Sequence, residues 1–238
     1  MLGLLVIIVI SWVLLHFIEK KNLKVLGIIP NKNRTVQFIM GFIMISLICL
    51  SMIYIETQIK SITWEKQVVN YKSIGNALIY HLRSALTEDL VFRGALLYIL
   101  ISRIGSRWAI LMSALVFGVY HIFSYGMTQD RIVPIIYVIL VTGFTGFVWA
   151  YAFHKTKSIM LGLGLHIGYN FIMTCFYPNQ PFGELLFVKL SQIELSEWNE
   201  FYYWLFRGFF PSIMTLISFK FLFKSNFVVN KTKEEHVK

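Results

Sequence analysis

Long apolar runs separated by short polar segments dominate the chain. A helix needs about 20 mostly apolar residues to cross a hydrocarbon core about 30 Å thick. By that measure the pattern predicts seven membrane-spanning helices, at residues 2–18, 36–55, 73–104, 107–123, 132–153, 158–177 and 201–223. The third run is long and polar at its start, which allows it to divide into an interfacial piece and a span. The expected fold is therefore all-α, a polytopic transmembrane helical bundle with about seven or eight spans.

The chain contains no internal repeat, no low-complexity segment and no linker long enough to separate domains. Residues 1–238 are therefore expected to form a single domain, whose polar motifs are concentrated in a core at about residues 73–177. The first apolar run has no Lys or Arg before it and no small-residue cleavage site after it, so it is interpreted as a retained span with its N-terminus outside.

Composition agrees with this class, since 57% of the residues are hydrophobic and 14% are charged, against about 25% charged in soluble domains. The net charge of +10 would point to nucleic acid in a soluble protein. In a membrane protein it instead reflects Lys and Arg gathered on the cytoplasmic side. We therefore expect a multi-pass cell-membrane protein, bounded by the lipid bilayer, with no nucleic-acid partner. The Ile-, Lys- and Asn-rich composition further favours a bacterial plasma membrane.

The distribution of Lys and Arg also predicts an orientation. Seven spans divide the loops into two groups, one on each side of the membrane. The loops on one side and the tail after Phe223 contain thirteen Lys and Arg residues, and the loops on the other side contain five. Because basic residues accumulate inside, the first group is expected in the cytoplasm. It comprises the loops at 19–35, 103–107 and 154–157, and the second group comprises those at 56–72, 124–131 and 178–200.

Charged residues interrupt the third apolar run. Asp89 and Arg93 are four residues apart, hence on one helix face in the favourable order for an ion pair. Glu88 points about 100° away and has no cation close in sequence. A charge within a span costs about 2.5–3.5 kcal/mol on insertion scales, so each is a functional candidate. For this segment alone, a purely structural ion pair is an equal alternative.

Two further runs carry polar groups at comparable depth. His121 ends the fourth run, and His166 and Asn170 share one face of the sixth, where Gly162, Gly164 and Gly168 would let another helix approach closely. At 1.5 Å per residue, Glu88 lies about 22 Å and His121 about 21 Å from the cytoplasmic ends of their spans. His166 and Asn170 lie about 16 and 22 Å in. These depths predict one common site.

Together these motifs resemble the CAAX-protease and bacteriocin-processing family of intramembrane proteases, also called the CPBP or Abi family. The resemblance rests on Glu88-Asp89-x-x-x-Arg93, Phe117-x-x-x-His121 and His166-x-x-x-Asn170, each on its own span, and covers residues 87–170. Asp89 stands where the family has a second glutamate. It keeps the charge but has a reach one methylene shorter, which is tolerable if this carboxylate only pairs with Arg93.

The resemblance implies an intramembrane endopeptidase that hydrolyses a peptide bond of a membrane-associated or leader peptide, in peptide maturation or bacteriocin self-immunity. Glu88 would activate water and His121 would hold it. His166 and Asn170 would donate to the oxyanion. Asp89 and Arg93 would support them. No cofactor is favoured; the alternative is a zinc ion held by Glu88, His121 and His166, with an open position for water.

Two other classes remain open. The same carboxylate and histidines could form a proton or ion relay in a transporter, although Pro134 and Pro211 fall near the starts of spans and no repeat is visible, which disfavours it. A non-catalytic immunity or scaffold protein would keep the fold, and Asp89 is the feature that favours it. His81 is seven residues before Glu88 and thus on about the same helix face, so it could join the site, but it is expected to face the membrane interface.

Overall fold

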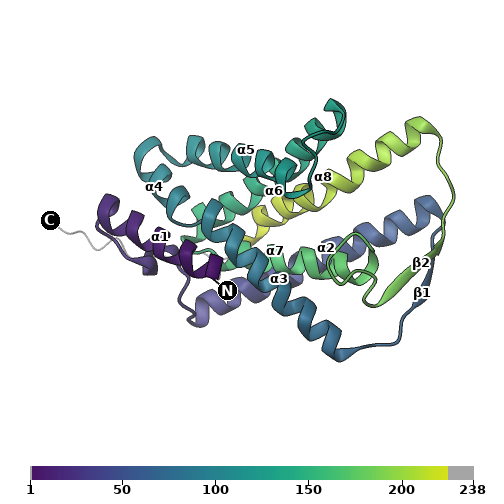
Figure 1. The fold of residues 1–238 in the computed structure, drawn as a ribbon, viewed down its shortest axis with the longest axis horizontal. Coiled ribbons are helices and arrows are strands. Elements are labelled where there is room, and N and C mark those ends of the chain that lie inside the picture. Colours follow the sequence, from purple (N-terminus) through teal and green to yellow (C-terminus); the bar gives the residue numbers. More distant parts are fainter. Residues whose placement is uncertain (1, 225–238) are drawn as a thin grey trace.

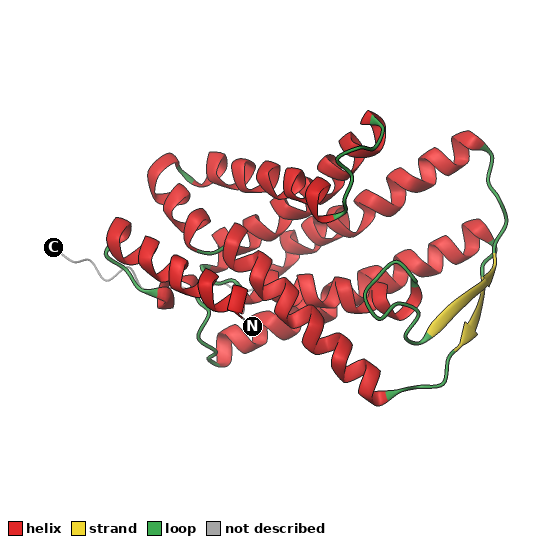
Figure 2. Cartoon of the chain, viewed as in Figure 1, coloured by secondary structure: helices red, strands yellow, loops and turns green. Residues whose placement is uncertain are grey.

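The computed structural model describes residues 2–224 and shows an elongated bundle of helices (Figures 1 and 2). The prediction of an all-α bundle is confirmed. In chain order the elements are α1 (Leu2–Glu19), a short 3-10 turn (Leu23–Leu26), α2 (Lys32–Lys60), β1 (Thr63–Lys66), α3 (Tyr71–Phe92), α4 (Ala95–Ile104), α5 (Ser106–Ser124), α6 (Ile132–Thr156), α7 (Met160–Phe176), β2 (Phe187–Ser191) and α8 (Glu197–Leu222).

Among the described residues, five helices are long and apolar enough to cross a membrane: α1, α2, α5, α6 and α8. The α7 helix is apolar but has only 17 residues, and α3 is more polar than the five. This is the helix content of a multi-pass membrane protein. The predicted number of seven or eight spans stays a prediction.

The third apolar run is not one helix. Its first part, α3, ends at Phe92, and α4 begins at Ala95 after a turn at Arg93 and Gly94. A Cβ atom at Gly94 would overlap the carbonyl oxygen of Leu90, so the chain can turn here only because this position has no side chain. The depth estimated for Glu88 along a continuous helix from Arg103 is therefore wrong.

Two other helix boundaries and one pair of strands differ from the sequence prediction. The α2 helix continues to Lys60, so Glu56 lies in a helix and not in the predicted loop. The α8 helix begins at Glu197, which places Pro211 inside it and not near its start. The unpredicted strands β1 and β2 form a two-stranded antiparallel sheet that joins the loop after α2 to the loop after α7.

The two predicted groups of loops lie at opposite ends of the molecule (Figure 1). At one end, Arg103 Nε lies 3.2 Å from Glu19 Oε1, and the backbone N–H of Ile159 donates to the Leu26 carbonyl at 3.0 Å. The small sheet lies at the other end. The grouping of the loops is thus confirmed, whereas the choice of cytoplasmic end stays a prediction, and residues 225–238 of the basic tail lie outside the described part of the chain.

Close contact between α2 and α7 depends on small residues. A Cβ atom at Gly164 would overlap the Phe38 carbonyl oxygen, and one at Gly168 would lie 2.8 Å from the Phe42 carbonyl oxygen. Such small positions let two helix backbones approach in a membrane. The predicted role is confirmed for Gly164 and Gly168, whereas a Cβ atom at Gly162 would make only an ordinary contact, 3.7 Å from the Trp149 carbonyl oxygen. The close approach fixes the helix that carries His166.

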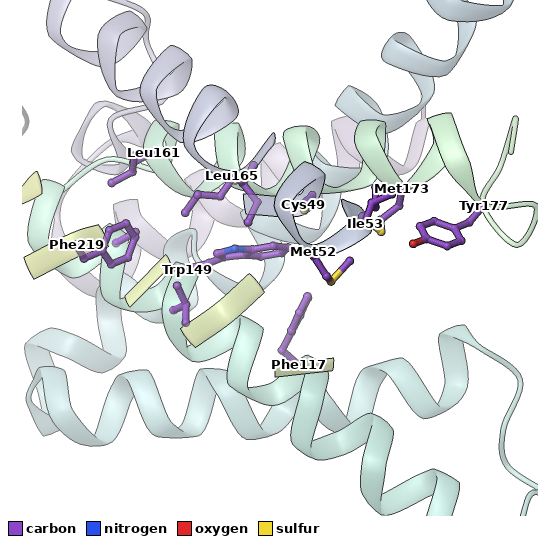
Figure 3. Close-up of a cluster of buried hydrophobic side chains, with 13 residues drawn as sticks. Cys49, Met52, Ile53, Phe117, Trp149, Leu161, Leu165, Met173, Tyr177 and Phe219 are labelled. Carbon is purple, nitrogen blue, oxygen red and sulfur yellow. The ribbon is translucent and has the colours of Figure 1, made fainter. Parts of the chain in front are cut away.

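Buried apolar side chains of α2, α5, α6, α7 and α8 form the largest core cluster. Figure 3 shows the Trp149 ring in the middle of this group, with Leu165 on one side and Phe117 on the other. The Trp149 ring centroid is 6.0 Å from that of Phe117 and 4.3 Å from that of His166. The core therefore continues directly into the polar residues singled out in the sequence.

Candidate active site

The last turn of α3 carries a buried ion pair. Asp89 and Arg93 are each about 2% exposed, and Arg93 Nη1 lies 3.2 Å from Asp89 Oδ1. The Arg93 guanidinium also lies over the Phe117 ring, 3.8 Å from its centroid. The pair predicted from the four-residue spacing is present, and it is enclosed by aromatic side chains.

His166 lies between two carboxylates. Its Nδ1 atom is 3.5 Å from Asp89 Oδ1, and its Nε2 atom is 3.8 Å from Glu88 Oε2. Both separations exceed ordinary hydrogen-bond lengths by less than about 1 Å. A small shift of the imidazole ring would therefore form a hydrogen bond with either carboxylate. The Trp149 ring covers one face of the imidazole. Residues from α3, α6 and α7 thus fix the position of this side chain.

The neutral form of His121 has a defined tautomer. Its Nδ1 atom is 2.8 Å from the carbonyl oxygen of Phe117, one turn earlier in α5. A carbonyl oxygen can only accept a hydrogen bond, so Nδ1 carries the hydrogen and donates it. The Nε2 atom consequently keeps a lone pair and can accept a hydrogen bond from a water molecule or a substrate N–H.

A cavity of about 180 Å³ lies between α5, α6, α7 and α8. His121, His166 and Asn170 line it together with hydroxyl groups from α6 and α8, including Thr145 and Ser212, which hydrogen-bond to each other at 2.9 Å. A cavity of about 150 Å³ can hold a molecule the size of benzene. This cavity can therefore hold one amino-acid side chain or a few water molecules.

Glu88 contacts His166 but lines a different space, a recess of about 390 Å³ between α1, α3 and α5. Ser84 Oγ donates to Glu88 Oε1 at 3.4 Å. Of the four residues predicted to share one common site, His121, His166 and Asn170 thus line one space and Glu88 lines another. The reason is the helix geometry: with Asp89 turned toward Arg93, the neighbouring Glu88 points about 100° away around α3.

The zinc alternative does not fit this arrangement. Within residues 2–224, no three His, Cys, Asp or Glu side chains gather into a possible metal site. Zinc ligands lie about 2 Å from the ion, which requires all three donors of such a set to converge. Glu88, His121 and His166 do not form a ligand set as they are placed here.

His81 was predicted to face the membrane interface, and this is wrong. Its side chain is 2% exposed, and its Nε2 atom lies 2.7 Å from the Thr174 hydroxyl in α7. A buried imidazole needs such a partner. His81 therefore joins α3 to α7 and supports the helix that carries His166.

A second polar group lies near the sheet end of the bundle and was not identified from the sequence. Tyr177 donates a hydrogen bond from its hydroxyl to the Glu56 carboxylate, and Lys60 Nζ lies 2.7 Å from Glu200 Oε1. A carboxylate oxygen can only accept a hydrogen bond, so the Tyr177 hydroxyl is the donor in this contact. The i, i+4 spacing of Glu56 and Lys60 at the end of an apolar run was the signal that could have revealed this group.

Comparison with known proteins gives a match over the helices on which the candidate residues lie. Residues 70–172, from the start of α3 through most of α7, match the family model described as type II CAAX prenyl endopeptidase Rce1-like. No curated protein and no solved structure gives a significant match. The matched segment contains Glu88, His121, His166 and Asn170. Over this segment, which is less than half of the chain, the protein is thus similar to the CAAX-protease family of intramembrane endopeptidases.

Proposed function

We propose that this protein hydrolyses a peptide bond of a membrane-associated or leader peptide with water activated by Glu88. The observation that carries the proposal is the position of His166. Its ring lies between the Glu88 and Asp89 carboxylates and also lines the cavity shared with His121 and Asn170. His166 thus connects the base Glu88, which lines the recess, to the hydrogen-bond acceptor His121 and the amide donor Asn170, which line the adjoining cavity.

Each step of hydrolysis has a candidate group. Glu88 takes a proton from water while the water oxygen attacks the carbonyl carbon of the peptide bond. His121 Nε2, which carries a lone pair, accepts a hydrogen bond from the second O–H of this water, and that hydrogen stays on the attacking oxygen. His166 and Asn170 donate to the oxyanion that forms on the carbonyl oxygen. Glu88 then delivers its proton to the leaving nitrogen, and the C–N bond breaks.

Asp89 and Arg93 position the other groups. Asp89 is buried, faces both Arg93 and His166 Nδ1, and lines neither the cavity nor the recess. Its carboxylate therefore has no need to reach water or substrate. This placement supports an active enzyme despite the aspartate at this position, and it disfavours the scaffold alternative. The biological setting that we propose is peptide maturation or self-immunity to a bacteriocin.

Replacing Glu88 by Gln tests the proposal. Gln keeps the size and hydrogen-bonding capacity of the side chain but cannot accept the proton, and losing a general base typically lowers rates about 10²- to 10⁴-fold. Purified protein in liposomes would be incubated with fluorogenic prenylated, membrane-bound and leader peptides. The control is Glu65→Gln, which changes an exposed carboxylate in β1.

Loss of cleavage in Glu88→Gln, with an unchanged melting temperature and full activity in Glu65→Gln, is the expected result. Undiminished cleavage by Glu88→Gln would exclude Glu88 as the base. It would also return the transporter and scaffold alternatives to consideration.

A further inference from the structure

Arg83 is an exposed cation in the middle of α3. It lies 12 residues after Tyr71, a rise of about 18 Å along the helix. Its backbone carbonyl accepts a hydrogen bond from Thr87, but within residues 2–224 its guanidinium has no ion pair or hydrogen bond with another side chain. Arg93, on the same helix, is buried and paired with Asp89. The two arginines of this segment therefore have different roles.

Arg83 is one of the residues that line the recess containing Glu88. An arginine at membrane depth normally faces a bundle interior or a water-filled space and marks a functional path. The recess is polar on the α3 side, where Tyr80, Ser84 and Thr87 accompany Arg83 and Glu88, and Gly3 and Leu4 of α1 form another wall. It therefore brings an unpaired cation and the proposed base to one space.

The anion that this cation binds must come with the substrate. Among the groups common to all peptides, only the C-terminal carboxylate is always an anion at neutral pH. The CAAX sequence named in the matching family model is a C-terminal motif, so such substrates present a free chain end. A guanidinium matches a carboxylate with two parallel hydrogen bonds.

We propose that Arg83 binds the C-terminal carboxylate of the peptide substrate and positions the bond to be cleaved beside Glu88. This inference rests on the proposed endopeptidase function. Arg83 and Glu88 are five residues apart, a rise of about 7.5 Å, and an extended peptide advances about 3.3–3.6 Å per residue. The cleaved bond then lies two or three residues before the end of the substrate. Arg83 acts as a positioning residue that recognises the chain end and not a side chain.

The test compares two peptides of identical sequence, one ending in a carboxylate and one in an amide. Wild-type protein should cleave the acid at least about tenfold faster than the amide, mainly through a lower KM. Arg83→Gln should lose this preference and cleave the amide at the wild-type rate. Arg83→Lys should restore part of the preference. The control Lys72→Gln changes another exposed cation of α3 and should retain it fully.

A binding measurement extends the test to a protein that turns over slowly. Short peptides of two or three residues, as acid and as amide, would be titrated into wild type and Arg83→Gln, with the melting temperature as the signal. Only the acid should stabilise the wild type, and neither should stabilise the variant.

The possible failures can be told apart. The role of Arg83 would be refuted if the wild type cleaved and bound the acid and the amide equally, or if Arg83→Gln still preferred the acid. Either result would leave the endopeptidase function unaffected. Cleavage of both peptides by Glu88→Gln at the wild-type rate would instead refute the proposed function.

Discussion

Replacing Arg93 by Met would leave the Asp89 carboxylate without its cation inside the bundle. Both side chains are about 2% exposed, and their charged atoms are 3.2 Å apart. Removing one partner of a buried pair typically costs about 3–5 kcal/mol, because the remaining charge stays desolvated. The guanidinium also lies 3.8 Å from the Phe117 ring centroid, but Met keeps most of that apolar contact. We therefore expect a loss of about 3–5 kcal/mol in the free energy of unfolding.

Thermal unfolding of the detergent-solubilised protein measures this loss. For a chain of this size, 1 kcal/mol corresponds to about 2–4 °C in melting temperature, so Arg93→Met should melt about 6–20 °C lower than wild type. The double variant Asp89→Asn/Arg93→Met removes both charges. It should be more stable than the sum of the two single effects predicts, by about 0.5–3 kcal/mol.

The matched control is Arg103→Met, which breaks an exposed ion pair with Glu19, where the arginine side chain is 60% exposed. Such pairs contribute about 0–1 kcal/mol, and the melting temperature should fall by less than about 4 °C. If Arg93→Met behaves like Arg103→Met, or if the double variant shows strictly additive losses, the buried pair does not stabilise α3.

Three further predictions address packing, metal dependence and orientation. Gly164→Ala should lower stability by about 1–3 kcal/mol, since its Cβ would overlap the Phe38 carbonyl. The control Gly75→Ala, whose Cβ would meet no atom within 4 Å, should not lower stability. Equal melting temperatures of the two variants would contradict the packing argument. Chelators should leave peptide cleavage unchanged, whereas a loss that added Zn²⁺ reverses would support a metal enzyme. Cysteines introduced into the 19–35 loop should be protected from an impermeant reagent in intact cells, and those in the 178–200 loop should react; the reverse pattern would invert the orientation.

The helices could be predicted because lipid imposes a length and a composition on each span. The predicted 107–123 run is α5, Ser106–Ser124, within one residue at each end. The break before α4 could not be located by hydropathy, which is apolar on both sides of Gly94. It follows from a backbone contact between Gly94 and Leu90 that only the folded chain displays. The strands β1 and β2 pair across five intervening helices, and local patterns carry no information about such distant partners.

The site was largely visible in the sequence because ionisable residues are conspicuous in apolar runs. Asp89 and Arg93 were predicted to pair and do so. The separate recess of Glu88 depended on how α3 turns about its axis, and hydropathy does not determine this rotation. Glu56 was missed because the predicted span ended one residue before it, at Ile55, although the helix continues to Lys60.

The pairing of β1 with β2 has a consequence for biosynthesis. During translation β1 emerges before α3, whereas its partner appears only after α7 has been made. Until then, β1 presents unpaired backbone groups at the membrane surface, and an open strand edge can pair with another chain. The Lys60–Glu200 ion pair can form only later, after the first turn of α8 has been synthesised. In a nascent chain arrested before α8, the sheet end of the bundle would therefore lack its ion pair with α8. A quality-control protease could recognise this incomplete end before any active enzyme is assembled.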